Sequence, residues 1–359
     1  MNCCVNCFAD KSLQSQIKAG SQDMGECDFC VSTDIQIISC NELSERFESI
    51  FNLYMSSDSE ESEAKNQNSS LLYHHLLNHW PGLFNSTILN EKSVKHLVNQ
   101  IGRGWEGYDD ILFSNKVEVL SDLVEYPTGE SQWDNFVREI KEENRFFLRE
   151  NLDLENLQAM LSKFSKTYKA GHVFYRARIS PTPLRVSDLG KPPKERTRPG
   201  RANPVGIPYL YLSDQEKTTI YEARAGLHES VSIGKFVLKS SLQVISLKDI
   251  LHYGPFEIVD MGFDLKEYIA VRPYLIKLEE ELAKPVRKDA VNLDYLPTQY
   301  LCEYIKSILG HDAIEYRSAM LDDGYNLAVF NDRNVECVSV NHYEIKALEY
   351  GYQPFVEMG

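Results

Sequence analysis

Four cysteines near the start of the chain have the residue types and spacing of a metal site. Cys4 and Cys7 form one C-x-x-C pair, Cys27 and Cys30 form a second, and nineteen residues separate the two pairs. Two such pairs supply four thiolates to a tetrahedral cation, as closed structural zinc sites do. We therefore expect a structural zinc ion, because no ligand position stays open for a reactive water. Reduced thiols are the alternative, and Cys3 leaves the register of the first pair open.

Two arginines in the second half of the chain lie on a segment that alternates as a strand does. In residues 172–179, HVFYRARI, a period of two places Phe174, Arg176 and Arg178 on one face. Burying an arginine on such a face is costly unless an anion meets the guanidinium. A carboxylate of the protein and a substrate phosphate are the two partners left open.

The loop that follows, residues 180–206, is basic and contains six prolines. It ends in GRANPVG, where Gly200 and Gly206 permit unusual backbone angles and Asn203-Pro204 favours a turn. A solvated surface loop and a rigid cover for a pyrophosphate are the two interpretations. The net charge of the loop is +4, from Arg185, Lys191, Lys194, Arg196, Arg198 and Arg201 against Asp188 and Glu195.

Tyrosine, glutamate and serine side chains come next. The segment IPYLYLS places Tyr209 and Tyr211 on one strand face, where a ring can stack and a hydroxyl can orient a ligand. The letters SDQE that follow have capping-box spacing and predict a helix from about Asp214, with Glu222 beside its narrow apolar stripe. By itself Glu222 is typical of a surface helix residue. Ser318, just after a short strand, likewise means little alone.

Mixed strands and helices must position these side chains. After Ala170, strand-like alternation appears in HVFYRARI, IPYLYL, KFVLKSSLQVISL and YNLAVF. Helical patterns lie between them in SDQEKTTIYEARAGLHE and PTQYLCEYIKSILG, the second ending at Gly310. Because the order lacks regular βαβ alternation, the sequence predicts an α+β fold.

The patterns divide the chain into four parts. Residues 1–55 hold the zinc knuckles, and the polar, acidic stretch 56–70 is typical of a linker or loop. Residues 71–164 have apolar side chains at three- and four-residue spacings and predict a small helical domain. Residues 165–359 contain the arginine, tyrosine, glutamate and serine side chains described above and form the domain in which we expect catalysis.

Charge and hydropathy narrow the function classes. The chain has 359 residues, a net charge of −15 and a pI near 5.1, which disfavours general nucleic-acid binding. No stretch approaches the roughly 20 apolar residues of a membrane span, and the first thirty residues lack the apolar core of a signal peptide. We therefore expect a cytoplasmic protein without membrane or nucleic-acid partners.

Taken in order, these motifs resemble a known family, the RES domain. FYRAR, then GRANPVGIPYLYLS leading into IYEAR, then YRSAM and GYNLAVF follow the family's pattern over roughly residues 165–335. Ala202 departs from it, since many members carry a bulkier residue there, which affects the expected pocket wall. The knuckles, CFAD and WDNFVREIKEENRFF resemble the HEPN/RES amino-terminal region.

Histidines in the expected helical domain do not indicate a nuclease. His74, His75, His79 and His96 are typical of helix faces or of satisfied histidines near a core. Helical HEPN ribonucleases carry an arginine followed four to six residues later by a histidine, and residues 71–166 contain no such pair. The sequence therefore does not support ribonuclease activity.

The resemblance implies a fold similar to that of ADP-ribosyltransferases and an enzyme that degrades NAD as a growth-arresting toxin. It assigns Arg176, Tyr211, Glu222 and Ser318 to catalysis, and Arg201 and Asn203 to substrate binding. In this assignment the arginines hold the pyrophosphate, Tyr211 stacks on nicotinamide or its ribose, Glu222 stabilises the oxocarbenium-like transition state, and Ser318 positions Glu222 or the ribose.

Several points stay open at this stage. Water, inorganic phosphate and a protein side chain are all acceptors that the motifs allow. A silent nucleotide-binding or interaction protein is the alternative from another class. A toxin–antitoxin or phage-defence role, a separate antitoxin, the partner of the amino-terminal half and the oligomeric state are equally undecided.

Overall fold

The computed structural model describes residues 1–56, 70–108, 113, 115–119, 129–148, 154–284 and 292–348. Most of the expected linker, residues 57–69, lies outside the described residues. Contacts between Cα atoms divide the chain into two compact units. Unit one comprises residues 1–136 and 249–277, and unit two comprises residues 137–248 and 278–359. The boundaries predicted at residues 55, 70 and 164 remain predictions.

Unit one begins with a small sheet that carries the cysteine pairs. Its strands run in the order β1-β3-β2, and all the pairings are antiparallel. A second three-stranded sheet has the order β4-β6-β5. The strands are β1 (Asn2–Cys4), β2 (Met24–Gly25), β3 (Ile35–Ser39), β4 (Tyr54–Ser56), β5 (Ser70–Leu71) and β6 (Lys116–Val119).

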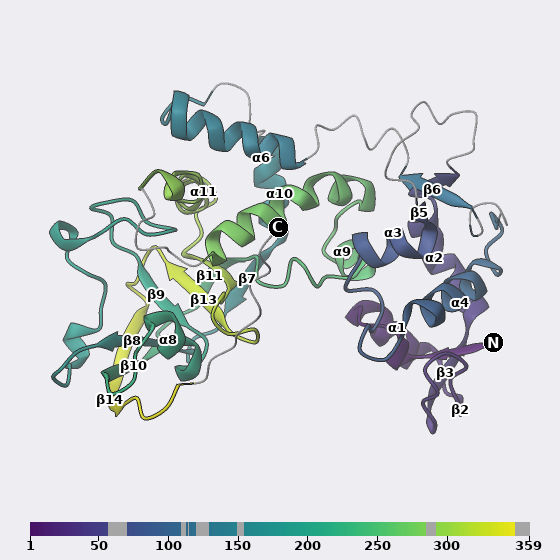
Figure 1. Ribbon diagram of the computed structural model, residues 1–359, viewed down its shortest axis with the longest axis horizontal. Helices are drawn as coiled ribbons and strands as arrows, with labels where there is room; N and C mark the ends of the chain where they lie inside the picture. The colour runs from purple at the N-terminus through teal and green to yellow at the C-terminus, as the bar shows by residue number, and fades with distance from the viewer. Residues whose placement is uncertain are drawn as a thin grey trace, which may run out of the picture. The chain divides into compact units, whose positions relative to one another are not determined.

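The helices of unit one pack around an aromatic core. Phe47 contacts Phe8, Phe51 and Phe256 with ring centroids 5.2–6.3 Å apart. Periodic apolar residues in α3 and α4 account for the helices expected after residue 71. The helices are α1 (Lys11–Gly20), α2 (Ser44–Phe51), α3 (Leu72–His79), α4 (Glu91–Gly102) and α9 (Pro255–Asp260), together with most of α6 (Gly129–Arg138) and the first part of α10 (Leu265–Ala283) (Figure 1).

A single buried carboxylate, that of Asp10, caps the N-termini of two helices of unit one. Asp10 Oδ1 accepts a hydrogen bond from the Leu13 amide at the start of α1, at 2.9 Å. Its Oδ2 accepts from the amides of Phe256 and Glu257 at the start of α9, at 2.9 and 3.3 Å. Burial raises the pKa of Asp10, while these amides act to lower it. Asp10 therefore links segments that are distant in the sequence.

Two of the histidines in unit one are satisfied, as their pattern predicted. His75 Nε2 lies 2.8 Å from the Val117 carbonyl oxygen, and His79 Nδ1 lies 3.0 Å from the Tyr54 hydroxyl. Burial lowers the pKa of His79 to about 4, with a smaller contribution from the charge of His75. Both contacts indicate a packing role.

Unit two is built on a mixed sheet of eight strands in the order β14-β10-β8-β9-β13-β12-β11-β7. Neighbouring strands are antiparallel except β11 and β12, which are parallel. The α+β prediction is confirmed. The strands are β7 (Ser165–Tyr168), β8 (Val173–Ile179), β9 (Leu210–Ser213), β10 (Ser230–Leu238), β11 (Leu242–Ser246), β12 (Ala313–Arg317), β13 (Tyr325–Val329) and β14 (Val335–Glu344).

The pairing between β8 and β9 is short. In the described register these strands share one residue pair, Tyr175 with Ser213, whereas β8 pairs with β10 over seven residues. Helix α8 (Glu216–Ala223) packs on β8 beside this junction (Figure 1). The remaining helices of unit two are α7 (Leu154–Lys163) and α11 (Leu296–Ser307), together with the end of α6 (Gly129–Arg138), its π-helical extension (Glu139–Glu143) and the last part of α10.

The capping box predicted for α8 is wrong. The helix begins at Glu216, with Gln215 as its N-cap and no side-chain cap. Ser213 ends β9, and its hydroxyl donates to Asn326 across the sheet. Asp214 accepts from the Thr218 hydroxyl at 2.7 Å and from the backbone of β13. Ser213, the side chain that the sequence pattern assigned to the cap, is therefore bound to β13 instead.

None of the helices in the described part of the chain combines the length and apolar character that crossing a bilayer requires.

Candidate active site

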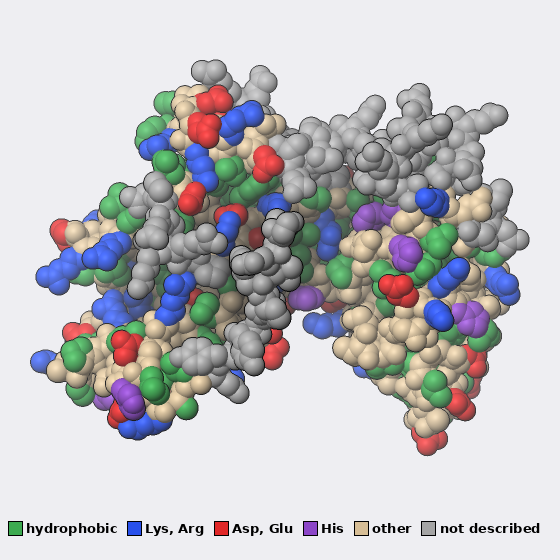
Figure 2. All heavy atoms as spheres, in the orientation of Figure 1, with side chains coloured by type: hydrophobic (Ala, Val, Ile, Leu, Met, Phe, Trp, Pro, Cys, Tyr) green, Lys and Arg blue, Asp and Glu red, His purple; other side chains and the backbone are tan. Residues whose placement is uncertain are grey.

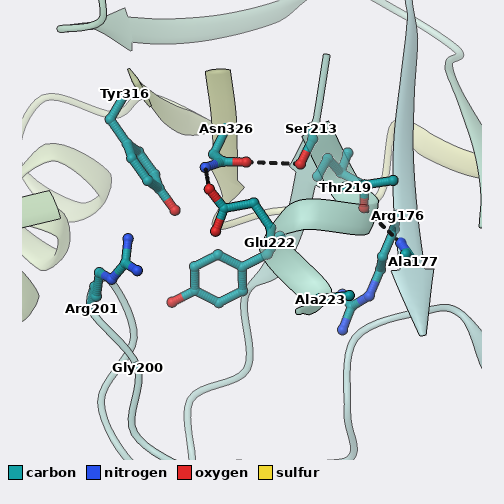
Figure 3. A pocket seen from close by; sticks show the side chains of 12 residues that line it. Arg176, Ala177, Gly200, Arg201, Ser213, Thr219, Glu222, Ala223, Tyr316 and Asn326 are labelled. Atoms are coloured by element: carbon teal, nitrogen blue, oxygen red, sulfur yellow. Dashed lines mark hydrogen bonds between the residues drawn. The ribbon is translucent and has the colours of Figure 1, made fainter. Parts of the chain in front are cut away.

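A cavity of about 290 Å³ lies beside the junction of β8 and β9, where these strands share a single residue pair. Side chains from β8, β9, α8, β12 and β13 line it, together with Gly200 and Arg201 of the preceding loop (Figure 3). Four of the six residues assigned to the site line the cavity, namely Arg176, Arg201, Tyr211 and Glu222. The other two, Asn203 and Ser318, hydrogen-bond to residues that line it.

Arg176 brings an uncompensated cation into this cavity. Its Nη1 is buried and has no hydrogen-bond partner among the described residues. Burial, together with a smaller effect of the positive charge of Arg178, lowers the pKa of Arg176 to about 10. The side chain is still charged at neutral pH. Since burying an unpaired cation is costly, the cavity is suited to an anionic ligand.

Arg178 is held in place by the basic loop. Its Nη2 donates to the Gly190 carbonyl oxygen at 3.0 Å. Figure 2 shows Lys and Arg side chains gathered over the loop that Figure 1 draws ahead of β9. Both observations fit a locally positive surface within an acidic protein.

Glu222 is fixed through one of its two carboxylate oxygens. Oε1 accepts a hydrogen bond from Ser318 Oγ and another from Asn326 Nδ2, each at 2.7 Å. Asn326 Oδ1 in turn accepts from Ser213 Oγ at 2.8 Å (Figure 3). Oε2 has no hydrogen-bond partner within the described ranges. The carboxylate is therefore oriented, with one oxygen left to meet a ligand.

Tyr211 contributes its ring to the cavity, while its hydroxyl is used elsewhere. The hydroxyl donates to Asn203 Oδ1 at 2.8 Å and accepts from the Ala202 amide at 3.3 Å. Burial raises the pKa of Tyr211 well above its ordinary value. The hydroxyl is thus suited to holding the loop and poorly suited to proton transfer.

The loop before β9 is shaped by close packing. Asn203 Nδ2 donates to the carbonyl oxygens of Arg198 and Pro204, both at 3.0 Å, so its polar atoms are engaged within the loop. A Cβ on Gly200 would lie 2.6 Å from Asn203 Oδ1 and 2.9 Å from the Tyr211 hydroxyl. Glycine is required there by this approach, while Gly206 has a φ of +78°.

Arg201 lines the cavity and also binds the end of a helix. Its Nη1 donates to the carbonyl oxygens of Leu282 and Ala283, at 2.8 and 2.9 Å, in the last turn of α10. A cation at a helix C-terminus meets the unpaired carbonyls and the negative end of the dipole. Part of its charge is therefore compensated by the protein.

Sequence reasoning missed Asn326, Ser213, Thr219 and Tyr316. Asn326 and Ser213 are register partners on β13 and β9 and are almost fully buried. Thr219 Oγ1 accepts from the Ala177 amide at 2.7 Å and ties α8 to β8. A polar residue inside the apolar run YNLAVF was a signal for Asn326, because buried polar groups need partners.

The four predicted metal ligands of unit one come together. The Sγ atoms of Cys4, Cys7, Cys27 and Cys30 all lie within 4.8 Å of one another. Three of these pairs are 3.4–4.0 Å apart, and a tetrahedron with Zn–S bonds of about 2.3 Å has edges of about 3.8 Å. The donor set therefore fits a zinc ion, with Cys3 outside the cluster.

Comparison with known proteins identifies the family of the second half of the chain. Residues 173–351 match the family model described as RES domain. This half of the chain is therefore a RES domain, and the resemblance seen in its motifs is confirmed. No curated protein matches the chain.

One solved structure is similar, "Crystal structure of the M.tuberculosis MbcT-MbcA toxin-antitoxin complex". The sequences are 13% identical, and the match covers 54% of this chain and 93% of the other. With a TM-score of 0.31, this similarity carries no argument about fold or function.

Proposed function

We propose that the protein is an NAD-consuming enzyme that cleaves the bond between nicotinamide and ribose. The observation that carries this proposal is the pairing, within one cavity, of an uncompensated guanidinium on Arg176 with an oriented carboxylate on Glu222. A dinucleotide offers a diphosphate for the first group and ribose hydroxyls for the second. The RES domain match adds its support.

The expected reaction is helped by charge that is already present in the substrate. When the glycosidic C–N bond breaks, its electron pair passes to the pyridinium nitrogen and neutralises it. Positive charge then develops on the ribose, where an aimed carboxylate stabilises the transition state more than the ground state. Glu222 Oε2 is available for this role, since Oε1 is occupied by two donors.

The arginines have unequal roles in this proposal. Arg176 binds the diphosphate most directly, because its Nη1 has no partner among the described residues. Arg201 contributes through the nitrogens that do not bind the carbonyls of α10. The cavity, about 290 Å³, is just below the range of about 300–1,000 Å³ for ligand sites, so we assign to it the nicotinamide mononucleotide half of the dinucleotide, whose phosphate meets Arg176.

Tyr211 serves as the wall of the site. Its ring lines the cavity and can stack on the leaving group, and its hydroxyl fixes the loop that carries Arg201. We assign Asn203 to the same loop contact. Ser318 and Asn326 position Glu222.

In unit one, Cys4, Cys7, Cys27 and Cys30 would hold a structural zinc ion. Bound there, the ion cross-links the two cysteine pairs of a small sheet.

The biological role that follows is a toxin whose NAD consumption arrests growth and which an antitoxin restrains. This part of the proposal rests on the family resemblance. Induced expression of the chain should lower cellular NAD and stop growth, whereas the Glu222→Gln variant should do neither.

Purified protein incubated with NAD tests the chemistry. We expect release of free nicotinamide, and Glu222→Gln should reduce the rate on the order of a hundredfold or more, because an aimed charge is lost while shape is kept. A variant with near-normal turnover would contradict the role of Glu222. Wild-type protein that releases no nicotinamide would favour a silent nucleotide-binding protein.

Phosphorus NMR of the products separates the acceptors. Free ADP-ribose indicates hydrolysis, and a phosphorylated ADP-ribose formed only with added phosphate indicates phosphorolysis. ADP-ribose phosphorus that stays with the protein indicates transfer to a side chain.

A further inference from the structure

The last turn of α10 is tied to two sides of the cavity by hydrogen bonds within unit two. On one side it receives Arg201, through the carbonyl oxygens of Leu282 and Ala283. On the other it binds Arg317, the residue that precedes Ser318, through Glu279. The family motifs contain no residue of α10, so this helix is an addition to the site that they describe.

Glu279 and Arg317 form a fork-to-fork ion pair. Arg317 Nε donates to Glu279 Oε1 at 2.8 Å, and Nη2 donates to Oε2 at 2.5 Å. The backbone amide of Arg317 also donates to Oε1, at 3.3 Å. The Glu279 side chain is fully buried, whereas one third of the Arg317 side chain is exposed. This geometry fixes both the side chain and the backbone of Arg317.

Arg317 is in turn placed to fix Ser318. It ends β12, and the Ser318 amide donates to the Gly324 carbonyl oxygen at 2.9 Å to close the following turn. Ser318 Oγ accepts from the Met320 amide at 3.1 Å and donates to Glu222 Oε1. A shift of the Arg317 backbone would therefore move the hydroxyl that orients Glu222.

Stability alone does not account well for this arrangement. Burying a carboxylate costs several kcal/mol of desolvation, and buried ion pairs are often no more stabilising than well-packed apolar residues. What the pair supplies is a fixed orientation, because three donors from one residue converge on one carboxylate.

We propose that Glu279 is a positioning residue of the active site, which acts through Arg317 and Ser318 on the carboxylate of Glu222. This inference rests on the proposed function for its kinetic readout. The last turn of α10 is then a brace for the site. Arg201 is bound to the same turn, so the brace supports both the carboxylate and one of the arginines of the cavity.

The test compares Glu279→Gln with Glu281→Gln as a matched control. Glu281 lies on the same turn, and its side chain is partly exposed and pairs with Lys284 at 3.0 Å. We expect Glu279→Gln to lower kcat for nicotinamide release at least fivefold with less than a twofold change in KM. The control should retain wild-type kcat.

A double-mutant cycle separates positioning from a general structural effect. In a Ser318→Ala background, Glu279→Gln should lower kcat by less than a further twofold, because the hydroxyl through which it acts is gone. An equal loss in both backgrounds, or an unchanged kcat in the single variant, would overturn the proposal. If Glu279→Gln does not fold, Arg317→Lys replaces it in the cycle with the same expectations, since it keeps the charge and loses the fork.

Hydrogen exchange provides a readout that does not depend on NAD. Amide protection in the turn from Ser318 to Gly324 should fall in Glu279→Gln and stay at the wild-type level in Glu281→Gln. Unchanged protection would refute the brace. Should the wild-type protein release no nicotinamide, the proposed function fails, and the exchange experiment still decides the positioning role.

Discussion

Replacing Asn326 with leucine would test how the carboxylate of Glu222 is held. The change keeps the approximate volume on β13 and removes one of the two donors to Oε1, at 2.7 Å. A hydrogen bond to a charged group contributes about 1.5–3 kcal/mol, and each 1.4 kcal/mol corresponds to about tenfold in rate. If the catalytic effect of Glu222 depends on its orientation, Asn326→Leu should lower kcat for nicotinamide release about ten- to a hundredfold.

Two controls make this prediction specific. Ser213→Ala removes the donor to Asn326 Oδ1 and leaves the bond from Nδ2 to Glu222, so its loss of kcat should be at most about threefold. Combined with Glu222→Gln, Asn326→Leu should cause little further loss, because both changes affect one interaction. The unfolding temperature and ADP-ribose binding report on the intact fold. A folded Asn326→Leu variant with near wild-type kcat would refute the reasoning.

Three further predictions concern charge and metal. Arg176→Lys should weaken NAD binding at least tenfold, because a point charge does not replace the planar fork; an unaltered KM would count against the anion site. Purified protein should contain one zinc per chain by elemental analysis, and Cys27→Ser should lose it and unfold at a lower temperature; metal-free wild type of equal stability would exclude this role. Since the pKa of His79 in the folded protein is about 4 and the ordinary value is 6.5, the unfolded chain binds more protons between these values, and stability should fall as pH drops from 6.5 to 4. His79→Gln should reduce the dependence of the unfolding free energy on pH, measured by urea titrations between pH 4 and 6.5. An unchanged pH dependence in this variant would contradict the role of His79.

Local patterns predicted most of the elements that carry the site. Alternation predicted β8 and most of β9. Motif order predicted that Arg176 and Glu222 would share a site, and both residues line the same cavity. Such signals lie within a few residues along the chain, which is where periodicity and motif spacing are informative.

Long-range contacts explain what the sequence did not predict. Arg201 binds backbone carbonyls 81 and 82 residues away, and a carbonyl carries no side-chain signal. The polar pair of Ser213 and Asn326 depends on the register of two strands 113 residues apart. The helix cap expected at Ser213 failed for the same reason, because a partner on another strand competed with the local one.

Unit one is built from two separate segments of the chain, and one of them lies within the half that would be isolated as the catalytic domain. Residues 249–277 lie inside the span that matches the RES domain, yet they pack with the amino-terminal segment: Phe256 on Phe47, Tyr268 on Trp80, and the start of α9 on Asp10. A fragment that starts at residue 165 lacks Phe47 and Trp80, so it would expose the rings of Phe256 and Tyr268 to water. The chain leaves unit two, completes unit one and returns to unit two, so no single cut in the polypeptide separates the two units whole.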